Sequence, residues 1–167
     1  SLTAVPDPVG SQGSAEDPGP NFARMVVGSE GTLCIVTEAS VNLVTVPARR
    51  GLAVLHFHDM AEACNASWEM LQHGPAAVEL IGRMIIERCR ESLGFARLAS
   101  FLEGDPDSIL VVELAAGSDR ELQQKLQDFK DSMGRQHIGY ACLTIADPAA
   151  QGRIWEMRDA GLGLLMS

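Results

Sequence analysis

Downstream of Gly51 the chain alternates short β-branched runs with segments whose apolar residues recur at helical spacing, and turn residues separate them. A period of two favours strands, and a spacing of three or four favours helices. Strands are expected over 52–57, 78–81, 109–115 and 140–146, and helices over 60–71, 84–93, 118–133 and from 148 onward. Without the second and the last helix the order is βαββαβ. This order predicts an α+β, ferredoxin-like fold, in which helices cover one face of an antiparallel sheet.

Capping residues mark where three of the expected helices begin. Asp59 suits the N-cap of the first, and Asp147 directly precedes Pro148, a residue favoured at the first helical position. Ser118 stands three residues before Glu121, the spacing of a capping box. These signals support the expected order of elements independently of apolar periodicity.

The first third of the chain differs in composition from the rest. Residues 1–23 are rich in Pro, Gly, Ser and Asp, which predicts a flexible loop or linker. Residues 24–48 are rich in β-branched side chains, so strands are expected on both sides of a glycine turn. A boundary then places the second domain at 49–167. Because the chain starts with Ser1 and its apolar pattern continues to the end, we expect a fragment of a longer polypeptide.

Charge and cysteine usage restrict the class of partner. With 22 acidic and 13 basic residues the formal net charge is −9, which argues against nucleic acid or an anionic membrane surface as a binding partner. No apolar run approaches the length of a membrane span. The four cysteines lack metal-like spacing, so we expect no metal site and reduced, mostly buried thiols in a cytoplasmic protein.

The turn Gly28-Ser29-Glu30-Gly31-Thr32 stands directly before a β-branched run. Its two glycines reach positive φ at little cost, and its N–H groups can point into one concavity that would suit an anion. The alternative is a tight turn that binds no ligand.

The longer string Gly28-Ser29-Glu30-Gly31-Thr32-Leu33-Cys34-Ile35-Val36-Thr37-Glu38 resembles the FAD-linked oxidases of the vanillyl-alcohol oxidase and p-cresol methylhydroxylase type. The resemblance is strongest to their D-lactate, glycolate and D-2-hydroxyglutarate dehydrogenase branch. It implies that 24–48 are the last strands of an FAD-binding domain and that 49–167 are a substrate (cap) domain. The cofactor contacts it implies are Gly28, Ser29, Glu30, Gly31, Thr32 and Ile35. Cys34 replaces the family's usual glycine, and its side chain would crowd the cofactor.

A second resemblance concerns the string Ile154-Trp155-Glu156-Met157-Arg158, which is similar to the Trp-x-x-Arg helix of the same dehydrogenases. There the arginine holds the carboxylate of a 2-hydroxy acid, a role that the planar guanidinium fork suits. Members that bind hydroxy-diacids carry a hydroxyl residue at the position of Leu162, so D-lactate or glycolate is the expected substrate. Residues 161–165 resemble a branch fused to iron–sulfur modules, which implies such a module as electron acceptor.

Other chemistry-bearing residues favour ordinary structural roles. His56 and His58 could form a metal pair on one strand face, but no third ligand is identifiable, so solvent-facing or loop histidines are favoured. Trp68 and Met70 are interpreted as packing residues on one helix. The resemblance places the family's general base and metal-binding histidines beyond the last residue. We therefore expect no catalytic residue here and an inactive isolated chain.

Two functional hypotheses remain open from the sequence. The first is a fragment of a flavin-dependent oxidoreductase that transfers a hydride from a 2-hydroxy acid to FAD, with a homo-oligomer allowed. The second is a non-catalytic, ACT-like ferredoxin module that binds a small molecule or dimerises. Fold class cannot separate them, because this architecture serves many functions.

Overall fold

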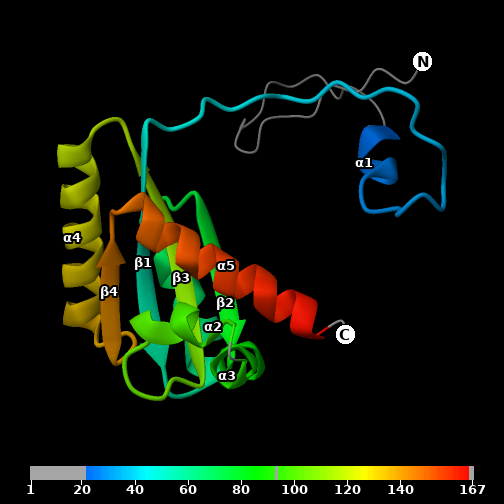
Figure 1. Ribbon diagram of the computed structural model, residues 1–167. Helices are drawn as coiled ribbons and strands as arrows, with labels where there is room; N and C mark the ends of the chain where they lie inside the picture. The colour runs from blue at the N-terminus through cyan, green and yellow to red at the C-terminus, as the bar shows by residue number, and fades with distance from the viewer. Residues whose placement is uncertain (1–21, 93, 166–167) are drawn as a thin grey trace. The chain divides into compact units, whose positions relative to one another are not determined.

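The computed structural model describes residues 22–92 and 94–165. Contacts divide the chain into two compact units, Ser1–Thr45 and Val46–Ser167. The second unit contains one antiparallel sheet in the strand order β2-β3-β1-β4 (Figure 1). Its strands are β1 (Arg49–Phe57), β2 (Ala77–Gly82), β3 (Ser108–Ala116) and β4 (Ala141–Ile145). The expected strands and the ferredoxin-like order are therefore confirmed.

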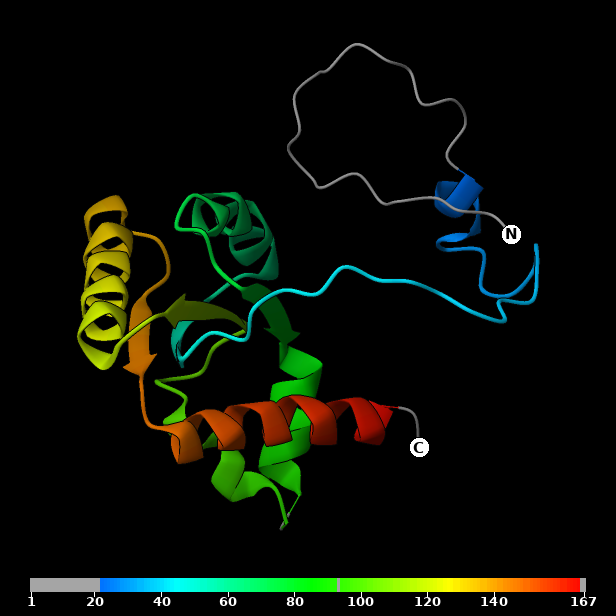
Figure 2. The ribbon, with the colours of Figure 1, turned by 90° about the horizontal axis from the view of Figure 1, so that it is seen from above.

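Helices cover both faces of this sheet (Figure 2). Helices α2 (Met60–Leu71) and α4 (Asp119–Gln136) pack on one face. The opposite face carries α3 (Arg83–Glu91), the 3₁₀ helix η1 (Ala96–Phe101) and α5 (Pro148–Leu165). The prediction of helices on one face holds for the two helices of the βαββαβ order, but it is wrong for the unit as a whole.

The sequence of β1 explains why both faces need a cover. Ala53, Leu55 and Phe57 belong to the core under α2 and α4, whereas Leu52 and Val54 belong to the core under α3 and α5. All five side chains are fully buried. Burial of a large apolar side chain contributes roughly 1.5–3 kcal/mol, so a strand apolar on both sides favours helices on both sides.

Side chains cap the helices close to the expected positions. The Ala61 N–H donates to Asp59 Oδ1 at 2.6 Å, and the Ala150 N–H donates to Asp147 Oδ2 at 2.8 Å. Ser118 Oγ accepts from the Glu121 N–H at 3.3 Å. The Glu121 carboxylate, however, accepts from Gly117, one residue before the N-cap that a capping box would use. The short η1 was not predicted, because two turns of 3₁₀ helix are too short to show an apolar period.

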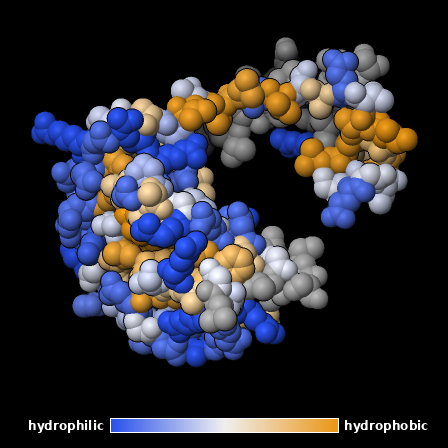
Figure 3. Space-filling view, viewed as in Figure 1, coloured by the Kyte–Doolittle hydropathy of each residue, from blue (hydrophilic) through white to orange (hydrophobic). Residues whose placement is uncertain are grey.

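The first unit contains α1 (Phe22–Val26) followed by the glycine turn. Residues 34–47 form no strand, and the strand expected to enter the turn is replaced by α1, so the expected strands over 24–48 are not formed here. A strand needs a neighbour to pair its backbone groups, and none of the described residues pairs with this segment. Its apolar side chains are exposed, Ile35 to 91%, and show as orange in Figure 3. The loop expected over 1–23 lies almost wholly outside the described residues.

Within the described residues, no helix combines the length and apolar character needed to cross a membrane.

Candidate functional site

The predicted substrate arginine, Arg158, lies on α5 and binds two carboxylates. Its Nε donates to Glu79 Oε2 at 2.9 Å, and its Nη2 donates to Glu79 Oε1 at 3.4 Å. Its Nη1 donates to Asp159 Oδ1 at 2.9 Å. The side chain is 42% exposed, so the guanidinium is open to solvent while both carboxylates hold it. Glu79 comes from β2, an edge strand of the sheet.

Two contacts fix α5 over the sheet and thereby place Arg158. Ile154 and Met157 are fully buried in the core between α5 and the sheet. One turn beyond Arg158, Gly161 lies directly against Ile85 of α3. The guanidinium therefore projects from a helix that is anchored on both sides of it.

More charged side chains of the sheet lie near Glu79. Glu113 of β3 is 12% exposed and pairs with Arg50 of β1 at 3.4 Å between Oε1 and Nη1. The register pairs Ala77 with Glu113 and Glu79 with Val111, so the two glutamates are diagonal neighbours on the face that α5 covers. Charged side chains thus border the apolar core at this end of the sheet.

The ion pairs keep Arg158 charged and define the local charge. Its pKa is raised, first by the hydrogen bond to Asp159 and then by that to Glu79. One basic and two acidic side chains give the cluster one formal negative charge. A substrate carboxylate would add another, so it binds favourably only if it replaces one of the two resident carboxylates.

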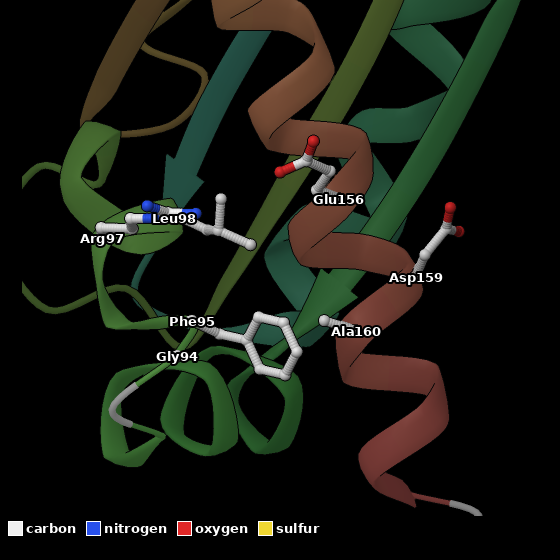
Figure 4. Close-up of a pocket in the computed structure, with 7 residues that line it drawn as sticks. All are labelled: Gly94, Phe95, Arg97, Leu98, Glu156, Asp159 and Ala160. Atoms are coloured by element: carbon white, nitrogen blue, oxygen red, sulfur yellow. The ribbon is translucent and has the colours of Figure 1, made fainter.

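A shallow pocket of about 320 Å³ lies between α5 and the segment that contains η1 (Figure 4). Its walls come from η1 with the preceding residues and from α5. Asp159 lines the pocket and also binds Arg158, so it joins the two features. The other lining residues are Gly94, Phe95, Arg97, Leu98, Glu156 and Ala160.

The glycine turn has the backbone form that the sequence predicts. Gly28 and Gly31 have φ of 80° and 79°, and Glu30 also has a positive φ of 48°. A Cβ added at either glycine would meet none of the described residues within 4 Å, so toward that part of the chain the turn offers an open backbone surface. The Ser29 and Thr32 N–H groups donate within the turn, to Val26 and Ser29. Two of the turn's N–H donors are thus already in use, and the contact of the turn with FAD stays a prediction.

His56 differs from its prediction, because it is fully buried rather than solvent-facing. Its Nε2 accepts from the Glu103 N–H at 3.2 Å, so the neutral ring carries its proton on Nδ1, which finds no hydrogen-bond partner among the described residues. Burial lowers the pKa of His56, and the backbone near Ala141 and the charge of Glu103 partly oppose this shift. Tyr140 donates to the Glu103 carbonyl at 2.7 Å, so the backbone of Glu103 is held on both sides.

Helix periodicity also misplaced some side chains on α2. Met70 is fully buried as expected, but Trp68 is 71% exposed and does not serve the packing role predicted for it. The expectation of mostly buried thiols is wrong, since Cys34 and Cys64 are exposed and Cys89 alone is fully buried. Across residues 22–92 and 94–165, no three His, Cys, Asp or Glu side chains are grouped as a metal site would require.

Comparison with known families shows to which protein family the chain is related. The family described as FAD linked oxidases, C-terminal domain, matches residues 46–167, the whole of the second unit. The chain belongs to this family. The match to this FAD-linked oxidase domain begins close to the boundary expected from sequence.

Curated relatives of this FAD-linked oxidase domain are dehydrogenases of two kinds. The chain is 23% identical over 154 residues to a D-2-hydroxyglutarate dehydrogenase of Pseudomonas putida. It is 26% identical over 156 residues to the enzyme of that name from Haemophilus influenzae. Each alignment covers 87% of this chain and 15% of the relative. A probable mitochondrial D-lactate dehydrogenase of Danio rerio is 27% identical over 145 residues, covering 84% of this chain and 27% of the relative. The chain thus spans a small part of each relative.

Proposed function

We propose that this chain supplies the carboxylate-anchoring part of a flavin-dependent dehydrogenase that oxidises a 2-hydroxy acid. The observation that carries the proposal is Arg158, which a fixed helix presents with one edge of its guanidinium turned to a sheet carboxylate. Family membership supports a flavin oxidoreductase, and the printed names of the relatives support 2-hydroxy acids as the substrate class.

In this proposal the residues of the chain bind and orient the substrate. Arg158 accepts the substrate carboxylate through two parallel hydrogen bonds, which fixes both the position and the plane of that group. FAD, bound by the complete protein, supplies the acceptor for the hydride. The open turn at Gly28 and Gly31 faces the cofactor, and an iron–sulfur module accepts the electrons.

A monocarboxylic hydroxy acid such as D-lactate or glycolate is the proposed substrate. A second carboxylate, as in 2-hydroxyglutarate, needs a hydrogen-bond donor or a cation near its distal end. Leu162, four residues after Arg158, can supply neither. The curated relatives include dehydrogenases for both kinds of substrate, so this choice rests on Leu162 alone.

The test uses the longest natural polypeptide that contains this chain, purified with its flavin. Replacing Arg158→Ala should lower kcat/KM for D-lactate or glycolate by roughly 10- to 100-fold, the effect of losing a charge-assisted pair of hydrogen bonds. Arg153→Ala is the matched control, because Arg153 is an exposed cation on the same helix. Equal kcat/KM in the Arg158 variant and the wild type would remove Arg158 from the site. A purified protein without a flavin spectrum would favour the non-catalytic ferredoxin-like module.

A higher kcat/KM for 2-hydroxyglutarate than for D-lactate and glycolate would contradict the proposed monocarboxylate preference. It would leave the role of Arg158 intact, since all three compounds carry the same 2-hydroxy carboxylate.

A further inference from the structure

The two carboxylates that bind Arg158 differ in how firmly they are held. Glu79 lies in β2, whose backbone pairs with β3 from Ala77 to Gly82, and its side chain is 34% exposed. Asp159 is the next residue after Arg158 on α5, and its side chain is 69% exposed. The sheet therefore fixes one partner of the guanidinium, while the other is an exposed side chain on the same helix.

The guanidinium has two edges that can each meet a carboxylate with two parallel N–H groups. Glu79 occupies the edge formed by Nε and Nη2, with contacts of 2.9 and 3.4 Å. Asp159 makes one hydrogen bond, to Nη1. The remaining edge, formed by Nη1 and Nη2, is thus contacted by a single oxygen of Asp159.

The packing of α5 prevents Arg158 from changing this arrangement freely. Met157, directly before it, is fully buried, and Gly161 lies against Ile85 one turn later. The helix and the edge strand that holds Glu79 are both anchored in the same core. With its backbone fixed in α5, the Arg158 guanidinium is held in the observed orientation by the two bonds to Glu79.

We propose that Glu79 is a positioning residue, which fixes the Nε edge of Arg158 and leaves the Nη1–Nη2 edge to the substrate carboxylate, while Asp159 is the resident carboxylate that the substrate displaces. The inference rests on the proposed function of Arg158. Replacing Asp159 by the substrate carboxylate costs little free energy, because an exposed ion pair contributes little to stability. Glu79 stays in place, so the plane of the bound carboxylate, and with it the direction of the 2-hydroxyl carbon, is set by the sheet.

Two substitutions that remove the same charge distinguish positioning from simple electrostatics. Glu79→Gln and Asp159→Asn each remove one negative charge beside Arg158 and keep the size of the side chain. If charge alone mattered, both variants would bind a carboxylate substrate more tightly. Positioning predicts opposite signs: Asp159→Asn lowers KM about threefold or more, whereas Glu79→Gln lowers kcat/KM about tenfold, with kcat itself reduced.

Conservative and control variants complete the kinetic series in the flavin-containing full-length protein. Glu79→Asp keeps the charge but shortens the side chain, so kcat should stay below wild type although the local charge is unchanged. Glu87→Gln removes a carboxylate that binds Arg83 at 2.7 Å, and should leave kcat and KM unchanged. A thermal unfolding curve for each variant checks that β2 remains folded.

A readout independent of turnover is the ¹⁵N-arginine NMR spectrum of the 167-residue chain. The Arg158 Nε–H signal, assigned by its loss in Arg158→Lys, should shift in Glu79→Gln and keep its position in Asp159→Asn. Equal kinetic effects of the two variants, or an Nε–H signal that Glu79→Gln does not move, would overturn the positioning role. If Arg158→Ala itself leaves kcat/KM unchanged, the proposed function fails, and the NMR result still reports whether Glu79 holds the guanidinium.

Discussion

The contact between α3 and α5 allows a prediction in which one substitution has opposite effects at two places on one helix. A Cβ added at Gly161 would overlap Cγ2 of Ile85 and lie 3.2 Å and 3.3 Å from its Cβ and Cγ1. A Cβ added at Gly152, also on α5, would meet nothing within 4 Å. Gly152→Ala is therefore the matched control for Gly161→Ala.

The expected free energies follow from two terms. Ala in place of Gly in a helix interior stabilises it by about 1 kcal/mol at either position. Overpacking a close-packed contact costs about 1–3 kcal/mol, and it applies only at Gly161, where the overlapping atom lies near the backbone of Ile85. Gly152→Ala should therefore raise the free energy of unfolding by up to about 1 kcal/mol. The free energy of unfolding of Gly161→Ala should be lower than that of Gly152→Ala by the whole cost of overpacking, about 1–3 kcal/mol.

Urea unfolding followed by far-UV circular dichroism measures both variants, and the midpoints should separate while the m-values stay equal. The double variant Gly161→Ala with Ile85→Ala removes the overlapping Cγ2, so it should show a favourable coupling energy. Equal stabilisation by both alanines, or no coupling to Ile85, would refute the close approach of α3 and α5. The prediction also concerns the site, because a displaced α5 would carry Arg158 away from Glu79.

Three further predictions concern the stability and the activity of the chain. Burial lowers the folded-state pKa of His56 below its ordinary 6.5, so the unfolded chain takes up the proton first. The free energy of unfolding should then fall as pH drops below about 6.5, more steeply in the wild type than in His56→Gln, as urea midpoints at several pH values would show. Met70→Ala should cost about 2–5 kcal/mol and Trp68→Gln less than about 0.5 kcal/mol in the same assay, since only Met70 is buried. The isolated chain should show no dehydrogenase activity with any 2-hydroxy acid and an artificial electron acceptor, and measurable turnover would contradict the expectation that it contains no catalytic residue.

The elements of the second unit could be predicted because their signals are local. Asp59 and Ser118 cap helices by hydrogen bonds to residues two or three positions away, so the chain nearby contains all the information. The positions of α3 and α5 could not be predicted in the same way. Which face of the sheet a helix covers depends on the route of its connections and on the apolar character of both sides of β1, which is a property of the assembled sheet.

Of the two residues that form the core of the candidate site, only one could be predicted from the sequence. Arg158 was identified through a resemblance, but its partner Glu79 lies 79 residues away, and only strand pairing and helix packing bring the two together. The available signal was one charged residue within the otherwise apolar run of β2. His56 was misjudged for a related reason: its environment depends on Glu103 and Tyr140, which the fold brings from other segments.

The central place of β1 also has a consequence for how the chain folds. Its two neighbours, β3 and β4, follow it by roughly 50 to 95 residues along the chain, whereas β2, the next strand in sequence, does not pair with it. Closing loops of this length before any pairing enthalpy is gained makes folding slow. During synthesis β1 must therefore remain unpaired until β3 and then β4 have followed it, and in this interval its backbone and apolar side chains are most open to aggregation.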